Sequence, residues 1–449
     1  MRQFLAFIAP LLIFVSFISS AFALEFKQYH TLQGTEIWHY KSDHLPLVSA
    51  RIVFPHGSAS DPENKVGLAT LAAATMDEGA GPYDSSAFRA LLKEHNINFS
   101  FEASRDFFAL SLEFLKLDMD KVIELSQYAL SEPRFDAKPV GLMKGQISAM
   151  LSQSMTDPDE LAARFATETY FDNHPYNLPS DGYIEDVKNI TKEDLQKFTK
   201  YLAQKNGFVV IVGDLEAEDA KKFANQIMSV LPQEPLQDKS PIPIYNPDIA
   251  GQKIFVPLSV GQTYLLFQGR GVLRHDKDFA ASFVAAHILG GGGFGSALME
   301  ELREKNGLTY GAASYLASGR KSGRFVISYA TDQTKVQKSI DIVESVLDDY
   351  IENGISAKEL SNAIQYLKGY YPIQFNTNEQ IAFLGQRLWE DGMPHNYPQL
   401  RDAYFEALTP EDVSKAAKNL FNGPFQIIAV GGEKPPAGFK VAEKSTIRF

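Results

Sequence analysis

Two stretches of this sequence recur at one spacing, and the repeat limits the folds that are open to the chain. Residues 190–195 (ITKEDL) match residues 408–413 (LTPEDV), and residues 209–213 (VVIVG) match residues 427–431 (IIAVG). The spacing is the same in both cases, because 408 − 190 and 427 − 209 both equal 218. Two matches at a single offset are hard to obtain by chance, so the sequence predicts two copies of one domain.

Each copy combines helices and strands in an order that points to an α+β domain. Strand runs alternate with helix runs and several strands read as hairpins, so we expect a mixed or antiparallel sheet with helices packed on one face. Residues 231–247 contain five prolines and read as an extended linker. We therefore expect an N-terminal domain over residues 24–230, a linker over 231–249 and a C-terminal domain over 250–449.

The composition is that of a globular protein and excludes several classes of function. The chain has 449 residues, of which 45% are hydrophobic, and its formal net charge is −12. This negative charge argues against nucleic acid as a partner, because phosphate binding needs a basic surface. The sequence has no cysteine, which excludes disulfides, a lipid-anchored cysteine and thiolate metal sites.

The first 23 residues have the parts of a secretory signal peptide. Arg2 is the positive start, residues 4–18 form an apolar run of 15 residues, and Ala21-Phe22-Ala23 is a small-x-small cleavage pattern. A transmembrane anchor is the alternative, but the run is short for a span of about 20 residues. Cleavage removes Arg2 and leaves a net charge of −13, since −12 − 1 = −13. We expect a periplasmic protein without membrane contact after cleavage, because a large exported chain without cysteine fits that compartment best.

A charged stretch in the second half, residues 301–311 (ELREKNGLTYG), runs from a helix end through a glycine into a predicted strand. Gly307 fits the position that ends a helix in the left-handed conformation, and the strand is expected over residues 310–317. Arg303 and Tyr310 are the two side chains in this stretch that could act on a ligand. On spacing alone, however, Arg303 reads as one charge of a solvated helix face and Tyr310 as a strand aromatic.

Several segments make the chain resemble a known family. They are the predicted strand, loop and buried helix of residues 50–80, Asn173-His174-Pro175-Tyr176 followed by Gly182, Val212-Gly213-Asp214, and, most specifically, Leu302-Arg303-Glu304-Lys305-x-Gly307-Leu308-x-Tyr310. On these segments the sequence resembles the pitrilysin/insulinase family of zinc metallopeptidases, which includes the mitochondrial processing peptidases. The resemblance covers nearly all of the expected mature chain. It implies a fold of two similar α+β domains, which agrees with the internal repeat.

The resemblance also indicates what this chain lacks. Active members of the family carry His-x-x-Glu-His on the buried helix, here expected over residues 66–77, where the two histidines bind zinc and the glutamate activates a water. The corresponding positions are Thr70, Ala73 and Ala74, and the family's third ligand, a glutamate, corresponds to Gln146. None of these side chains binds zinc strongly, so we expect a pseudo-peptidase domain without metal. The nine histidines offer no substitute, because no two are spaced i, i+3 or i+4.

The second half keeps side chains that the family uses in catalysis. In the family, an arginine and a tyrosine of the C-terminal half bind the substrate backbone and help to hold the tetrahedral intermediate. Arg303 and Tyr310 match those positions. With the resemblance, this functional interpretation is favoured over a solvated helix face and a strand aromatic.

A glycine run, Gly290–Gly293 with Gly295, precedes this stretch. It is not a phosphate-binding loop, because Ser296-Ala297 stands where Lys-Ser/Thr would be needed. A tight helix-to-helix turn is the favoured interpretation. The alternative is a loop that handles substrate, which is the part that the resemblance implies for the noncatalytic subunit of processing peptidases.

These expectations combine into one main hypothesis. The protein would be the noncatalytic subunit of a heterodimeric periplasmic zinc metalloendopeptidase, inactive alone, with Arg303 and Tyr310 contributed to the zinc site of a homologous partner that carries the intact motif. An extended peptide would be the substrate, and this chain would bind no cofactor itself. The alternative is a homodimeric pseudo-enzyme that binds peptides without cutting them, and an independent peptidase with unusual ligands is a weaker third hypothesis. The peptide, the partner's identity and the stoichiometry stay open.

Overall fold

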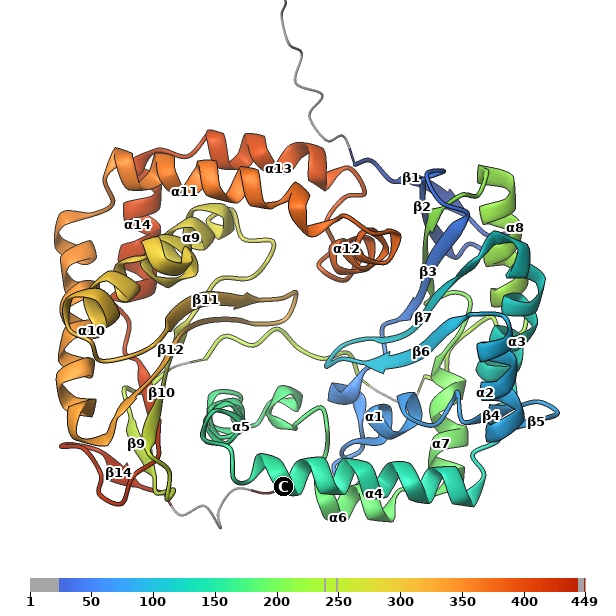
Figure 1. Cartoon of the computed structure of the whole chain (residues 1–449), viewed down its shortest axis with the longest axis horizontal. Coiled ribbons are helices and arrows are strands. Elements are labelled where there is room, and N and C mark those ends of the chain that lie inside the picture. The colour runs from blue at the N-terminus through green and yellow to red at the C-terminus, as the bar shows by residue number, and fades with distance from the viewer. Residues whose placement is uncertain (1–23, 238–239, 248, 443–447, 449) are drawn as a thin grey trace, which may run out of the picture.

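The computed structural model describes residues 24–237, 240–247, 249–442 and 448, and it contains two six-stranded sheets, one in each half of the molecule (Figure 1). The strand order is β1-β2-β8-β3-β7-β6 in the first sheet and β11-β12-β10-β13-β9-β14 in the second. The predicted α+β fold of two similar sheet-and-helix units is confirmed. The expected signal peptide, residues 1–23, lies outside the described residues.

The strands of each sheet come from one half of the chain. The first sheet contains β1 (Lys27–His30), β2 (Glu36–Lys41), β3 (Leu47–Phe54), β6 (Asn98–Ala103), β7 (Phe108–Leu115) and β8 (Phe208–Gly213). The second sheet contains β9 (Lys253–Val256), β10 (Gln262–Arg270), β11 (Ala312–Ser318), β12 (Gly323–Asp332), β13 (Gln426–Val430) and β14 (Lys440–Val441). A separate hairpin joins β4 (Gly79–Ala80) and β5 (Tyr83–Asp84).

Five strands of one sheet correspond to five strands of the other in order and direction. In the first sheet β3 is antiparallel to β7 and β8, while β2 runs parallel to β8. In the second sheet β10 is antiparallel to β12 and β13, while β9 runs parallel to β13. The matched sequences VVIVG and IIAVG therefore fall on the corresponding strands β8 and β13. Only one edge strand of each sheet has no counterpart, because β1 precedes its sheet in the sequence and β14 follows its own.

The helices are distributed over both halves. Those of the first half are α1 (Leu68–Ala73), α2 (Ser85–Glu94), α3 (Met119–Ser131), α4 (Ala137–Ser154), α5 (Pro158–Tyr170), α6 (Ile184–Asn189), α7 (Lys192–Phe198) and α8 (Ala217–Met228). Those of the second half are α9 (Phe279–Ala286), α10 (Val336–Asn353), α11 (Ala357–Tyr370), α12 (Asn378–Glu390), α13 (Tyr397–Glu406) and α14 (Pro410–Phe421). Two π-helices follow α9, namely η5 (His287–Gly291) and η7 (Met299–Lys305).

The repeated ITKEDL and LTPEDV sequences start helices α7 and α14 in the same way. Each begins with a capping box, in which the threonine hydroxyl accepts from the aspartate N–H and the aspartate carboxylate accepts from the threonine N–H. The pairs are Thr191 with Asp194 and Thr409 with Asp412. In the second box, hydrogen bonds from Thr409 hold the pKa of Asp412 below its usual value. The repeat therefore preserves local chemistry as well as topology.

One helix of each half packs against the sheet of the other half. Helix α5 packs on strands β10 and β13, and α12 packs on β3 and β8; Figure 1 shows the green α5 beside the yellow-brown sheet and the orange α12 beside the blue one. The α12 contact is formed by the buried side chains Trp38, Val53, Phe208, Ile381, Leu384 and Leu388. The α5 contact is formed by Leu161, Ala162, Ala166, Leu266, Val326 and Ile428. The remaining helices of each half cover the opposite face of its own sheet.

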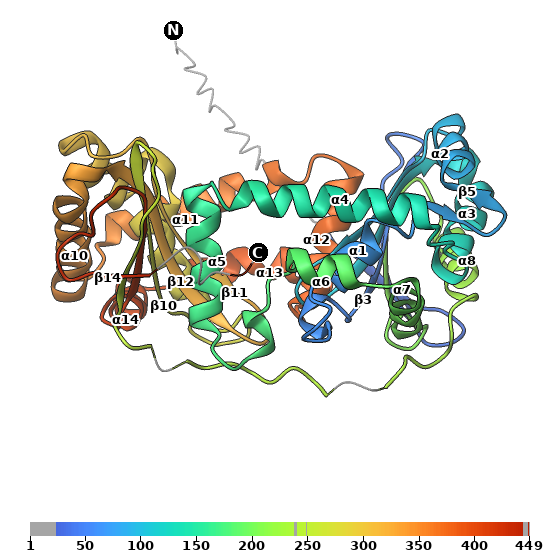
Figure 2. The same cartoon turned by 90° about the horizontal axis from the view of Figure 1, so that it is seen from below.

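The described part of residues 231–249 contains neither helix nor strand and runs along one side of the molecule between the halves (Figure 2). Tyr245 fixes it to both halves. Its N–H donates a 2.7 Å hydrogen bond to the carbonyl of Lys321, and its hydroxyl donates a 2.6 Å bond to the carbonyl of Tyr170. The exact domain limits on either side of this segment stay a prediction.

No helix within the described residues is both long and apolar enough to cross a membrane.

Candidate functional site

Helix α1 carries the positions at which the family places its zinc motif. Its start is fixed by Asp61, whose carboxylate accepts hydrogen bonds from the N–H groups of Gly67 (2.9 Å) and Ala69 (3.1 Å). Gly67 has φ +98° and a close approach to Gly182, so only glycine fits before the helix. The regular helix ends at Ala73, which makes it shorter than the predicted span of residues 66–77.

The side chains at these positions do not fit zinc. The hydroxyl of Thr70 donates a 2.6 Å hydrogen bond to the carbonyl of Ser180, Ala73 is only 7% exposed, and Ala74 caps the helix. Gln146 lies exposed on α4, which packs against α1. None of the four positions presents an imidazole or a carboxylate, the groups that bind zinc when thiolates are absent. Among the described residues, no group of three His, Asp or Glu is placed to hold a metal ion.

Arg303 lies on the π-helix η7, which the sequence did not predict. Gly307, at φ +59°, ends this helix as expected, with its N–H bonded to the carbonyl of Arg303 at 3.0 Å. The N–H of Leu308 bonds to the carbonyl of Leu302 at 2.8 Å, which folds the chain back on the helix. The Arg303 side chain is half-buried. Single π-turns of this kind are frequent at functional sites.

The charges around Arg303 are paired with one another. Lys305 forms ion pairs with Glu301 at 2.6 Å and with Glu300 at 2.9 Å. The hydrogen bonds that Lys305 donates to these two carboxylates, Glu301 first, raise the pKa of Lys305. Glu300, Glu301 and Lys305 therefore form a set of mutually paired charges beside Arg303.

Tyr310 stands in the loop between η7 and β11 rather than in the strand. The strand begins only at Ala312, because the hydroxyl of Thr309 bonds to the backbone of Gly311 and turns the chain there. The carbonyl of Leu308 accepts a 2.7 Å hydrogen bond from the buried Thr331 hydroxyl. The backbone is thus fixed on both sides of Tyr310, whose side chain is 83% exposed. The phenol group of Tyr310 is therefore accessible to a ligand or to another protein chain.

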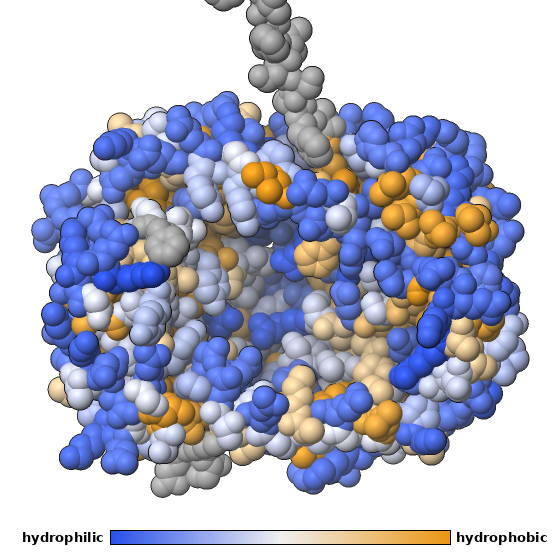
Figure 3. All heavy atoms as spheres, in the orientation of Figure 1, coloured by the Kyte–Doolittle hydropathy of each residue, from blue (hydrophilic) through white to orange (hydrophobic). Residues whose placement is uncertain are grey.

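The structure places these two sets of residues in different halves. Thr70, Ala73 and Ala74 belong to α1 in the first half, whereas Arg303 and Tyr310 precede β11 in the second half (Figure 1). Figure 3 shows that this face of the molecule is hollowed between the halves and that hydrophilic residues gather in the hollow.

The glycine run forms a close contact with β11. A Cβ added to Gly290 would lie 2.4 Å from the N atom of Ser314, so the π-helix η5 and the strand can only approach this closely with glycine. His287, at the start of η5, stacks on Tyr366 of α11 with ring centres 5.2 Å apart. Burial lowers the pKa of His287, which favours a neutral ring. Tight packing explains Gly290, while Gly293 and Gly295 have open space around them.

Sequence reasoning missed a cavity of about 690 Å³ between the two halves. It is lined by the β6–β7 turn, by the β11–β12 turn, by the end of α12 and by the described part of the linker around Leu236 and Ile242. Four of its residues carry positive charge, namely Arg105, Arg320, Lys321 and Arg387. The internal repeat is the sequence signal that could have indicated this cavity, because the β6–β7 and β11–β12 turns occupy corresponding places in the two sheets.

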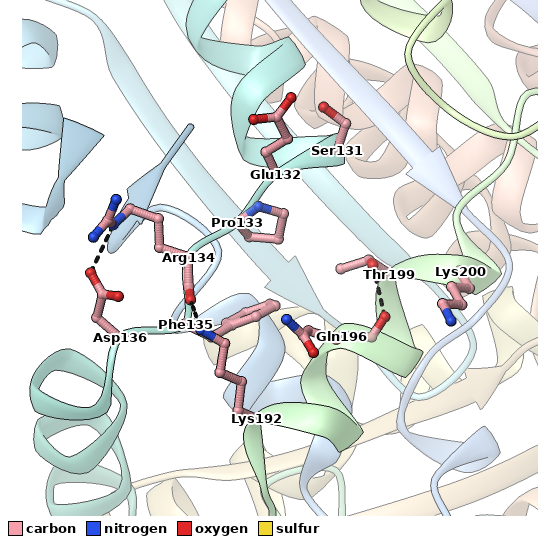
Figure 4. Close-up of a pocket in the computed structure, with 10 residues that line it drawn as sticks. All are labelled: Ser131, Glu132, Pro133, Arg134, Phe135, Asp136, Lys192, Gln196, Thr199 and Lys200. Atoms are coloured by element: carbon pink, nitrogen blue, oxygen red, sulfur yellow. Dashed lines mark hydrogen bonds and ion pairs between the residues drawn. The ribbon is translucent and has the colours of Figure 1, made fainter. Parts of the chain in front are cut away.

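A second hollow, of about 610 Å³, lies within the first half between the α3–α4 connection and α7. Figure 4 shows the ring of Phe135 extending toward Gln196 of α7. The charged groups at the edge of this hollow bond to one another. Arg134 forms an ion pair with Asp136 at 2.8 Å, and Lys192 donates a 2.7 Å hydrogen bond to the Arg134 carbonyl. This hollow contains none of the residues that the sequence singled out.

Two family models match the chain. One is described as insulinase, peptidase family M16, and matches residues 39–181; the other is described as the peptidase M16 inactive domain and matches residues 189–367. The chain belongs to peptidase family M16, the insulinase family. The predicted resemblance to this family is confirmed, and the names of the matching domain and relatives support an inactive member.

Individual relatives agree with this assignment. A protein named non-peptidase homolog YmxG from Helicobacter pylori is 28% identical over 365 residues, which cover 80% of this chain and 83% of that protein. Zinc protease PqqE from the same organism is 25% identical over 185 residues, 38% of this chain and 39% of that protein. A crystal structure of a peptidase M16 inactive domain from Pseudomonas fluorescens superposes with a TM-score of 0.84 at 28% identity, covering 93% of this chain and all of the other.

Proposed function

We propose that this protein is the noncatalytic subunit of a heterodimeric periplasmic zinc metalloendopeptidase. It supplies Arg303 and Tyr310 for substrate binding and intermediate stabilisation at the zinc site of a homologous partner, and it binds no metal itself. The proposal is carried by the exposure of Tyr310: its side chain is 83% exposed on a fixed loop, while α1 of the same chain lacks zinc ligands. A cation and a hydroxyl donor at fixed positions stabilise developing oxyanion charge, provided that another chain brings the reacting centre.

The relatives in Helicobacter pylori support a mixed pair. One is named a non-peptidase homolog and the other a zinc protease, and both are similar to this chain. A single organism therefore holds one protein of each kind that the proposed heterodimer requires.

The sheets offer a way to bind the substrate. Strands β6 and β11 are edge strands, each paired on one side only. An extended peptide can add to such an edge through its main chain, which gives affinity without a strict sequence requirement.

Co-purification from the native periplasm, followed by metal analysis, tests the proposal. We expect the protein to be recovered after loss of residues 1–23, bound to a homologous chain with His-x-x-Glu-His, with zinc in the pair. Purified alone, it should contain no stoichiometric zinc and cleave no peptide. Zinc-dependent cleavage by the isolated chain would overturn the proposal. Recovery of a homodimer that binds peptides without cutting them would favour a peptide-binding pseudo-enzyme instead.

A further inference from the structure

The cavity between the halves lies where two corresponding hairpin turns meet. The β6–β7 turn contributes Arg105 and Asp106, and the β11–β12 turn contributes Arg320 and Lys321. Figure 1 shows the two hairpins pointing toward each other across the molecule. Both turns are held by backbone hydrogen bonds, including Ala59 N–H to the Arg105 carbonyl at 2.8 Å. The charged side chains are therefore carried on fixed backbone.

Arg105 is a cation without an acceptor. Its Nε is buried and has no hydrogen-bond partner, and its guanidinium forms no ion pair with the described part of the chain. The guanidinium instead lies over the rings of Phe171 (5.3 Å) and Tyr176 (5.1 Å). The guanidinium of Arg324 lies 5.3 Å from the same Phe171 ring. Burial, and then the charge of Arg324, lowers the pKa of Arg105, so this donor group is both desolvated and repelled.

The acidic residues that line the cavity are already engaged. Asp106 accepts hydrogen bonds of 2.6 and 2.7 Å from the Tyr176 hydroxyl, and burial raises its pKa. Glu390 pairs with Arg387 at 3.1 Å.

The third acid, Asp391, pairs with Arg274 at 3.4 Å. Arg320 in turn donates to the carbonyl of Trp389 at the end of α12. Lys321 has no ion pair among the residues that the structure describes. The charges that are left to meet a ligand are therefore the cations Arg105 and Lys321.

We propose that this cavity is an anion-binding site, which takes a ligand through a carboxylate or phosphate group with Arg105 as the fork-shaped donor and Lys321 as the second cation. The remaining lining includes Phe107, Tyr201, Leu236 and Ile242, which suit an apolar body behind the charged group. The volume of about 690 Å³ is that of a small-molecule pocket or of a site for one chain end. The site lies within this chain and needs no second subunit.

Calorimetry on the mature chain tests the site with four probes. These are inorganic phosphate, phenyl phosphate, N-acetylphenylalanine and its neutral amide. We expect at least one of the two aromatic anions to bind, and the amide to bind about tenfold more weakly or not at all, because an arginine fork discriminates for charge. Comparison of the carboxylate with the two phosphates identifies the preferred head group. Failure of both aromatic anions to bind, or binding of the amide as tightly as the preferred aromatic anion, would overturn the proposal.

Two variants and a charge-matched control locate the binding. Arg105→Gln and Lys321→Gln should each weaken binding of the preferred anion about tenfold or more, because each removes a charge-assisted contact. Lys338→Gln removes an exposed charge on α10 and should leave binding unchanged. Circular dichroism checks the fold, and Lys321→Gln decides the question if Arg105→Gln does not fold. Wild-type affinity in the folded variants would place the anion elsewhere and contradict the assignment.

Discussion

The hydroxyl of Tyr170, on α5, donates a 2.8 Å hydrogen bond to the carbonyl of Gly323 at the start of β12. Tyr170 belongs to the first half of the chain and Gly323 to the second, so this buried bond joins the halves. Burial raises the pKa of the Tyr170 phenol, which keeps it protonated and able to donate. The bond accompanies the apolar contact between α5 and the second sheet, which is also crossed by hydrogen bonds from Thr169 to Gln426 and from Gln268 to the carbonyl of Ala166, each 2.8 Å long.

Removing this hydroxyl should weaken the joint between the halves. Tyr170→Phe removes this bond, while the carbonyl of Gly323 keeps its 3.0 Å hydrogen bond from the Gly271 N–H, and should lower the free energy of unfolding by about 1 kcal/mol. Urea denaturation followed by circular dichroism measures the change. Tyr404→Phe, at an exposed tyrosine of α13, is the control and should have little effect. Equal stability of the two variants would show that the bond contributes nothing.

The exchanged helix α12 should not tolerate a larger residue at its contact with the first sheet. A Cβ added to Gly385 would lie 2.7 Å from Val210 Cγ2 and 3.0 Å from Phe26 Cζ. Gly385→Ala should therefore destabilise the protein by about 1–3 kcal/mol through overpacking, despite the helix preference of alanine. Gly369→Ala on α11, where a Cβ meets nothing within 4 Å, should instead stabilise by about 0.5–1 kcal/mol. Thermal unfolding of both variants tests the difference in sign.

The two capping boxes should contribute alike to stability. Thr191→Ala and Thr409→Ala each remove a hydroxyl that accepts from the third residue of the helix, and each should cost about 1 kcal/mol. The two sites lie in different halves and share no partner, so the double variant should show the sum of both effects. Chemical denaturation measures all three. A clear departure from additivity would mean that the equivalent helices are coupled across the molecule.

Glu168 on α5 should make stability fall as the pH rises. Its Oε1 lies 3.8 Å from Arg164 Nε, which is too long for a hydrogen bond, and burial raises its pKa from 4.5 to about 6. The pKa of Glu168 is higher in the folded protein than in the unfolded chain, so the unfolded chain releases this proton at a lower pH. The contribution of Glu168 to the free energy of unfolding is therefore favourable below pH 4.5 and is lost as the pH rises through about 6.

Glu168→Gln should remove this slope and stabilise the protein at neutral pH by about 1 kcal/mol, allowing for partial exposure. Denaturation curves recorded on both sides of the interval from 4.5 to about 6 measure it. Glu433→Gln, at an exposed residue, is the charge-matched control. A slope that persists unchanged in Glu168→Gln would assign the pH dependence to other groups.

In a reconstituted pair, Arg303→Ala and Tyr310→Phe should each lower turnover about 10²-fold while the pair still forms, because they remove a cation or a donor from the developing oxyanion. Arg303→Lys should rescue only part of the loss, since it keeps the charge but not the planar fork. Size-exclusion chromatography checks assembly, and Lys338→Ala serves as the control. Wild-type turnover in both variants would assign Arg303 and Tyr310 a purely structural role.

The sequence predicted those features that depend on local pattern. The repeat at an offset of 218 residues and the left-handed Gly307 both follow from residue types at fixed spacing, and the structure contains both. The π-helices were missed because i→i+5 bonding has no signature in a run such as MEELREK. Tyr310 fell outside its predicted strand because the Thr309 hydroxyl competes for the backbone at Gly311.

Features that depend on distant contacts could not be predicted. Helix α5 reads as an ordinary amphipathic helix, and nothing in residues 158–170 says that its apolar side chains meet Leu266 and Ile428 rather than the nearer sheet. The cavity between the halves requires Arg105 and Lys321, which are more than two hundred residues apart in the sequence, to meet in space. The positions of the family's zinc motif, Thr70, Ala73 and Ala74, could in contrast be located from the sequence, because the family resemblance aligns them directly.

The exchange of α5 and α12 has a consequence for how the protein is made. Trp38 and Phe208, on the first sheet, are covered only when Leu384 and Leu388 arrive. During synthesis, this apolar face of the first sheet would therefore stay exposed to solvent until nearly nine-tenths of the chain has been made. Cleavage of the chain at its linker would leave two fragments that each expose an apolar surface and are prone to aggregate. A polypeptide built in this way completes both cores together, and only after most of its second half has been made.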